Sequence, residues 1–121
     1  MLRVAISVGA LVAMVGTVWA GPAQDLGDAY RAYDAGELAT AKAKLAKLDE
    51  RKLANRDYYF YLRGMVSLRT GDPAMAKAAF AALAKERGSR FEKEVPWRLA
   101  DVAWVAGDRV AAAAAYGKLA A

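Results

Sequence analysis

The chain has 121 residues, of which 57% are hydrophobic and 26% charged, with a formal net charge of +5 and neither cysteine nor histidine. This length and composition are typical of a single folded globular domain. The two missing residue types exclude disulfides, thiol catalysis and histidine-based acid, base or zinc chemistry.

Residues 1–20 differ in composition from the rest of the chain. One basic residue, Arg3, precedes an uncharged stretch over residues 4–19. A positive start, an apolar run and small residues at its end form the pattern of an export signal. The sequence therefore predicts a signal peptide that is cleaved after Ala20.

Export of a chain without cysteine fits a bacterial periplasmic or secreted protein. The alternative is an uncleaved inner-membrane anchor, but the apolar run is shorter than the ~20 residues that a spanning helix needs. It also contains Ser7, Gly9 and Gly16. After cleavage we expect no stable membrane span, and a mature chain with 17 basic and 13 acidic residues, a net charge of +4.

The mature chain repeats itself every 35 or 36 residues. A glycine followed by an acidic residue recurs at Gly36, Gly71 and Gly107. Glycine accepts the left-handed backbone at a helix end, and an acid favours the start of the next helix. Three further columns match, five, nine and twelve residues after each glycine: Ala41, Ala76 and Ala112, then Leu45, Phe80 and Tyr116, then Leu48, Leu83 and Leu119.

This spacing predicts an all-α chain of three antiparallel helix pairs. The apolar columns follow the three-to-four residue rhythm of one helix face. Asp72 and Pro73 mark a helix start with special clarity, because Asp caps free amides and Pro is tolerated at the first helical position. The predicted helices span residues 24–35 and 38–48, 57–70 and 73–87, and 96–106 and 109–120, in repeats of about 23–56, 57–92 and 93–121.

A repeat of about 34 residues with two helices resembles the tetratricopeptide family over residues 21–121. The turn glycine and the first two columns occupy that family's signature positions, and the small residue seven before each glycine is Ala29, Gly64 or Ala100. The large aromatic usual four before the glycine is absent, so the repeats are degenerate. The resemblance implies an α-solenoid.

The resemblance also implies a function. In that family the first helices line an inner wall that binds a peptide of a protein partner. Carried onto this chain, the groove residues are Tyr30, Tyr33, Tyr58, Tyr61, Met65, Arg69, Trp97, Asp101 and Trp104. Tyrosine and tryptophan dominate binding hot spots. The sequence therefore predicts a non-enzymatic interaction module of the cell envelope, with a role in scaffolding, assembly or maturation.

The same aromatic residues could instead fill the core of a small domain. This alternative is strongest for Tyr59, Phe60 and Trp97, and weakest for Tyr30 and Tyr33, which stand beside charged residues.

Two further surfaces suggest other partners. Lys42, Lys44 and Lys47 could attract an anionic envelope component, either a lipid or a glycan. The last helix is apolar all round over residues 110–116. Repeat arrays need a polar cap at each end, and none is visible here. Because alanine is an excellent helix former, a partly exposed alanine surface is tolerable; the alternative is that this helix docks onto a second copy of the chain or onto a larger partner.

Catalysis is not expected. Ser67 and Ser89 have no histidine to activate them, and neither a phosphate-binding glycine loop nor a metal-ligand spacing occurs. We predict no enzyme activity, no cofactor and no metal. Basic and aromatic residues together suit single-stranded nucleic acid, but export argues against that partner.

Overall fold

The computed structural model describes residues 21–121, so the predicted signal peptide 1–20 lies outside the described residues. All regular structure within residues 21–121 is helical, which confirms the predicted all-α class for this part of the chain. The elements are α2 (Pro22–Asp34), α3 (Leu38–Ala46), the 3₁₀ helix η1 (Glu50–Lys52), α4 (Arg56–Arg69), α5 (Pro73–Ala84), α6 (Val95–Val105) and α7 (Arg109–Ala120).

Two helices begin at aspartates, as the sequence predicts. The Asp72 carboxylate accepts a hydrogen bond from the Met75 amide at 3.1 Å, and the Asp108 carboxylate accepts one from the Ala111 amide at 3.1 Å. Each bond satisfies an amide that has no partner within its own helix. Glu37, the acid after the first turn glycine, makes no such bond.

Two predicted helix ends are wrong, because α3 ends at Ala46 rather than at residue 48 and α5 ends at Ala84 rather than at residue 87. After each helix the next two amides donate to carbonyls three residues back, not four. This tightens the backbone into a 3₁₀-type turn. Helix α2 begins two residues before the predicted start at residue 24. Every other observed helix boundary agrees with its predicted position or differs from it by one residue.

The three turn glycines have the backbone that the sequence predicts. Their φ angles are +79° at Gly36, +77° at Gly71 and +89° at Gly107. The amide that follows each glycine donates to the carbonyl five residues back, which is the helix-ending motif that favours glycine. These turns fix where each pair of helices folds back on itself.

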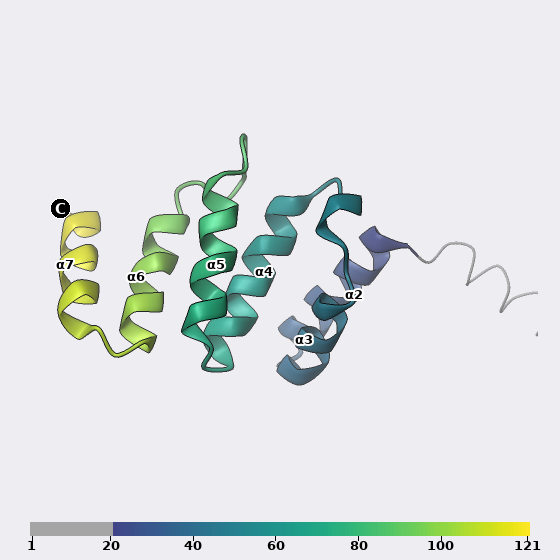
Figure 1. The fold of residues 1–121 in the computed structure, drawn as a ribbon, viewed down its shortest axis with the longest axis horizontal. Helices are drawn as coiled ribbons and strands as arrows, with labels where there is room; N and C mark the ends of the chain where they lie inside the picture. The colour runs from purple at the N-terminus through teal and green to yellow at the C-terminus, as the bar shows by residue number, and fades with distance from the viewer. Residues whose placement is uncertain (1–20) are drawn as a thin grey trace, which may run out of the picture.

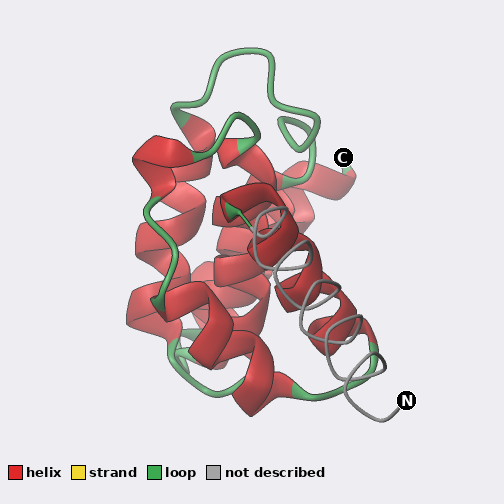
Figure 2. Cartoon of the chain, turned by 90° about the vertical axis from the view of Figure 1, so that its right-hand side faces the viewer, coloured by secondary structure: helices red, strands yellow, loops and turns green. Residues whose placement is uncertain are grey.

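Consecutive helices pack side by side along the chain (Figure 1). The first helix of each pair also contacts the first helix of the next pair, since α4 contacts both α2 and α6. Among the described residues, the second helices α3, α5 and α7 do not pack against one another in the way that the first helices do. Figure 2 shows the loops gathered at the two ends of the helices.

The core lies between the helices and combines residues of the repeat columns with others, among them Tyr59, Phe60, Leu62 and Val66 of α4. Ala41, Ala76 and Ala112 are fully buried. A Cβ atom at Gly64 would lie 2.5 Å from the ring of Phe80, which is itself fully buried. The small residue seven before the turn therefore makes room for the large residue nine after it.

The last helix is the least buried element. In α7 only Ala112 is buried, and Val110 is 84% exposed. An apolar hollow of about 520 Å³ opens between α6 and α7, lined by Pro96, Leu99, Ala100, Ala103, Ala111, Ala115, Lys118 and Leu119. Within residues 21–121, none of the helices has both the length and the apolar character required to cross a bilayer.

Candidate functional site: the first-helix face

The nine predicted groove residues all lie on α2, α4 and α6, which are the first helices of the three pairs. Of these helices, α4 contacts both α2 and α6. We call them the first-helix face: Tyr30 and Tyr33 on α2, Tyr58, Tyr61, Met65 and Arg69 on α4, and Trp97, Asp101 and Trp104 on α6. None of the nine residues lines any of five hollows found on the described chain. The nine side chains therefore belong to a face rather than to a deep pocket.

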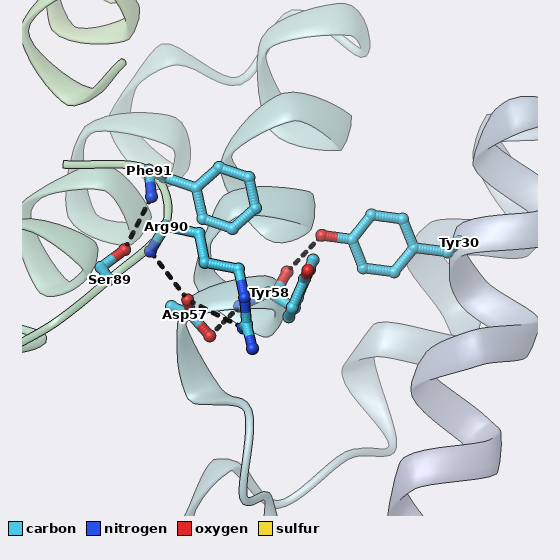
Figure 3. A network of polar contacts seen from close by, with 6 residues as sticks. All are labelled: Tyr30, Asp57, Tyr58, Ser89, Arg90 and Phe91. Atoms are coloured by element: carbon cyan, nitrogen blue, oxygen red, sulfur yellow. Dashed lines mark hydrogen bonds and ion pairs between the residues drawn. The ribbon is translucent and has the colours of Figure 1, made fainter. Parts of the chain in front are cut away.

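Three of these residues join Phe91 in an aromatic cluster. The ring of Phe91 stacks on Tyr61 with centroids 4.1 Å apart and meets Tyr58 edge to face at 5.3 Å. Tyr30 meets Tyr58 edge to face at 5.9 Å, and its hydroxyl donates to the Tyr58 carbonyl oxygen at 2.8 Å (Figure 3). All four side chains are half-buried. These geometries are the favoured ones for aromatic pairs, so the cluster fastens α2 to α4.

The loop of residues 85–94 carries Phe91 and is held against the start of α4. The amide of Arg90 donates to the Asp57 carboxylate at 3.3 Å, and the Arg90 guanidinium lies 3.6 Å from the same oxygen (Figure 3). That guanidinium also lies 4.8 Å above the ring of Tyr58. Arg56 pairs with Glu86 at 3.1 Å. The loop thereby covers Tyr58 and Tyr61 in the first half of α4.

Two half-buried tyrosines of the cluster have raised pKa values and stay protonated at neutral pH. Burial and the nearby Glu94 carboxylate raise the pKa of Tyr61 to about 12. Burial, together with the neighbouring Tyr61 and Tyr58, raises the pKa of Tyr30 further. Both hydroxyls are therefore neutral hydrogen-bonding groups at neutral pH, and neither is poised as a nucleophile or base.

Tyr33, Met65 and Arg69 continue the face toward the turns. Tyr33 and Met65 are half-buried and pack against the core. Arg69 is exposed, and its guanidinium carbon lies 5.2 Å from the centroid of the Tyr33 ring. This contact joins the end of α4 to the end of α2.

The two tryptophans of α6 are the exposed large hydrophobic side chains of the face. Trp97 is 39% exposed and Trp104 is 45% exposed. Seven residues apart on a helix, they lie on the same side and about 10 Å from one another. Trp97, which the sequence placed among the core candidates, is thus outside the core. The ring of Tyr116 lies 6.3 Å from that of Trp97.

Asp101 lies between the two tryptophans and organises a polar group. Its carboxylate accepts hydrogen bonds from Arg98 at 2.8 Å and from the Tyr116 hydroxyl. The second bond raises the pKa of Tyr116 to about 12. Arg98 lies 3.8 Å from Glu94 as well. Asp101 is therefore occupied within the chain, and its predicted groove position serves to fix α7 against α6.

Sequence reasoning missed three residues beside the face, namely Phe91, Tyr116 and Arg109. Phe91 lies in a loop, where helical register gives no signal. Tyr116 was assigned to the packing column of the third repeat, yet its hydroxyl reaches Asp101. Arg109 lies with its guanidinium carbon 3.9 Å from the centroid of the Trp104 ring, a contact that the spacing of five residues across a turn could have suggested.

The described residues offer no arrangement for metal chemistry, since no group of three or more histidine, cysteine, aspartate or glutamate side chains gathers within residues 21–121. Among the polar groups of the face, the Tyr30 hydroxyl and the Asp101 carboxylate are hydrogen-bonded within the chain, and the Arg69 guanidinium lies over the Tyr33 ring. What the face can do chemically is make contacts, through exposed indole rings and guanidinium groups.

Comparison of the chain with protein-family models, with curated proteins and with solved structures finds no match.

Proposed function

We propose that the mature chain is a tetratricopeptide-like solenoid that holds a peptide of a protein partner against the first-helix face in the bacterial cell envelope, without catalysing a reaction. The observation that carries the proposal is the exposure of Trp97 and Trp104 on one side of α6. Exposed apolar side chains that gather on one side of a molecule mark interaction sites, and tryptophan is enriched in binding hot spots.

The packing of the helices supports the solenoid part of the proposal. First helices contact one another, whereas the second helices are not packed together to that extent. An array packed more closely on one side curves toward that side, so the first helices would lie on the inside of the curve. Gly64 lies against the ring of Phe80, so two of the signature positions of the resemblance meet between the paired helices α4 and α5.

The test is capture of a partner from an envelope extract by the tagged full chain and by a Tyr33→Ala, Trp104→Ala double variant. Hot-spot residues each contribute about 2 kcal/mol or more, so a genuine partner should be lost with the double variant. The matched control is Met75→Ala, Val110→Ala, which removes two exposed apolar side chains from α5 and α7. A partner that survives the first variant, or is lost with the control, contradicts the proposal.

A second candidate is binding of an anionic lipid or glycan through Lys42, Lys44 and Lys47. All three are exposed, and none makes an ion pair within residues 21–121. Two residues apart on a helix are separated by about 200°, so Lys42 and Lys44 point to different sides of α3. Recovery of the same lipid or glycan with all variants of the capture experiment would favour this candidate.

Self-association through α7 is a further proposal, supported by the apolar hollow between α6 and α7. Light scattering across a wide concentration range tests it. A mass that stays monomeric at all concentrations would rule it out.

A further inference from the structure

The arginines of the described chain differ in whether their guanidinium groups form ion pairs or hydrogen bonds with other described residues. Five are ion-paired with carboxylates within residues 21–121: Arg31, Arg51, Arg56, Arg90 and Arg98. Arg63 directs its donors to the Tyr59 hydroxyl and the Met75 sulfur. Arg69, Arg87 and Arg109 make neither a side-chain hydrogen bond nor an ion pair with the described residues.

Two of these three arginines lie over aromatic rings of the first-helix face. The guanidinium carbon of Arg69 is 5.2 Å from the Tyr33 centroid, and that of Arg109 is 3.9 Å from the Trp104 centroid. Both arginines are exposed. A ring restrains the guanidinium through its face and leaves the N–H groups at its edge free, which favours two-point recognition of a carboxylate.

Both stacks lie at the same edge of the array. Tyr33, Arg69 and Trp104 stand within two residues of the ends of α2, α4 and α6, and Arg109 begins α7. The turns that join α4 to α5 and α6 to α7 lie at one edge in Figure 1. The stacks are separated by one to two helix spacings, which is about 10–20 Å for packed helices.

The same edge also carries four acidic residues: Asp34, Glu37, Asp72 and Asp108. Two of them, Asp72 and Asp108, cap α5 and α7. The edge as a whole is therefore not a basic surface of the kind that attracts a polyanion such as a lipid bilayer or a nucleic acid. It can instead recognise separate carboxylates placed at the two arginines.

We infer that the peptide held by the first-helix face carries two carboxylates, one for Arg69 and one for Arg109, within an otherwise neutral segment. An extended chain rises about 3.3 Å per residue, so the two acidic residues are about three to six positions apart. This inference rests on the proposed function and specifies the chemistry of its ligand.

The experiment selects binders from a displayed library of random twelve-residue peptides on the immobilised full chain. In parallel, the library is selected on the Arg69→Gln, Arg109→Gln double variant and on a control, Arg51→Gln, Arg87→Gln. The control removes the same charge from two exposed arginines that lie over no ring. Circular dichroism checks that all three proteins are folded.

On the wild type and the control we expect enrichment of peptides with two acidic residues three to six positions apart. On the Arg69→Gln, Arg109→Gln variant these peptides should be lost. For an enriched peptide that is then synthesised, Arg69→Gln and Arg109→Gln should each weaken the binding affinity about tenfold. This is the size typical of a hydrogen bond to a charged group. Replacing both acids of the peptide by glutamine should remove the dependence on these arginines.

Failures of the two proposals are distinguishable. Enriched peptides without acidic pairs that bind the Arg→Gln variant normally, but lose binding when Tyr33 and Trp104 are replaced, overturn the carboxylate inference and leave the proposed function standing. If no peptide is enriched on the wild type, or if enriched peptides are indifferent to all of these variants, both proposals fail.

Discussion

The two halves of the first-helix face hold similar aromatic residues in different ways. On α2 and α4, tyrosines are drawn into a cluster by Phe91, which stacks on Tyr61 at 4.1 Å. On α6, Trp97 and Trp104 remain 39% and 45% exposed. The loop of residues 85–94 folds back over α4, and no described residue covers α6 in the same way. Equivalent positions in successive repeats are therefore packed against a loop in one half and left exposed in the other.

The largest expected effect is on the covered half. Phe91→Ala removes the ring that stacks on Tyr61 and meets Tyr58. Loss of a fully buried phenylalanine costs 3–5 kcal/mol, and for this half-buried ring we expect about 2 kcal/mol of unfolding free energy, measured by urea denaturation. Phe91→Leu, which keeps apolar volume, should cost about half as much. A loss below about 0.5 kcal/mol for Phe91→Ala would show that the cluster does not stabilise the array.

A second test addresses the packing beneath that half. Gly64→Ala places a Cβ atom 2.5 Å from the ring of the fully buried Phe80, so we expect a loss of about 1–2 kcal/mol from overpacking. Gly117→Ala is the matched control in α7, where a Cβ atom would meet nothing within 4 Å. There the better helix propensity of alanine should add about 0.5–1 kcal/mol. Effects of the same sign at both sites would contradict this description of the core.

The third prediction concerns alkaline pH. The pKa of Tyr61 is raised to about 12 from the ordinary value of 10. The unfolded chain therefore loses this proton first, and stability falls as pH rises from about 10 to about 12. The melting temperature should decline over that range, and Tyr61→Phe should reduce the decline. A Tyr61→Phe protein with the full alkaline decline would exclude Tyr61 as a contributor.

The smallest effect is expected on the open half. Trp104→Ala removes an exposed ring whose one described cation–π partner is Arg109. Such exposed contacts contribute about 0.5–1 kcal/mol, so the unfolding free energy should fall by no more than that. Urea denaturation beside Phe91→Ala makes the comparison directly. A loss as large as that of Phe91→Ala would mean that the open half is structural too.

The fold was predictable from the sequence where the signals are local. The glycine turns at Gly36, Gly71 and Gly107 need only a left-handed residue between two helical stretches, and the caps at Asp72 and Asp108 need only one side chain. The ends of α3 and α5 were not predictable, because alanine and lysine favour helix on both sides of the actual end. There the backbone tightens to enter the next loop.

The division of the face into two halves was also beyond the sequence. Register places Tyr61 and Trp97 at equivalent positions in successive repeats, each ten residues before its turn glycine. What separates them is Phe91, which stacks on Tyr61, is 30 residues from it in the chain and lies in a loop without periodicity. The contact of Phe91 with the tyrosines of α4 depends on how the loop of residues 85–94 folds back. The hydrogen bond and the ion pair between Arg90 and Asp57 hold the loop in that position.

The central claim, that a partner contacts the exposed side chains of the first-helix face, is tested most directly by site-specific photo-crosslinking in living cells that produce the full chain. A photoreactive phenylalanine analogue replaces Trp97 in one full-length variant, and Met75 or Val110 on the second helices in two others. We predict one discrete cross-linked partner from position 97 and none from positions 75 and 110. The same product from all three positions, or products from positions 75 and 110 alone, would contradict the account.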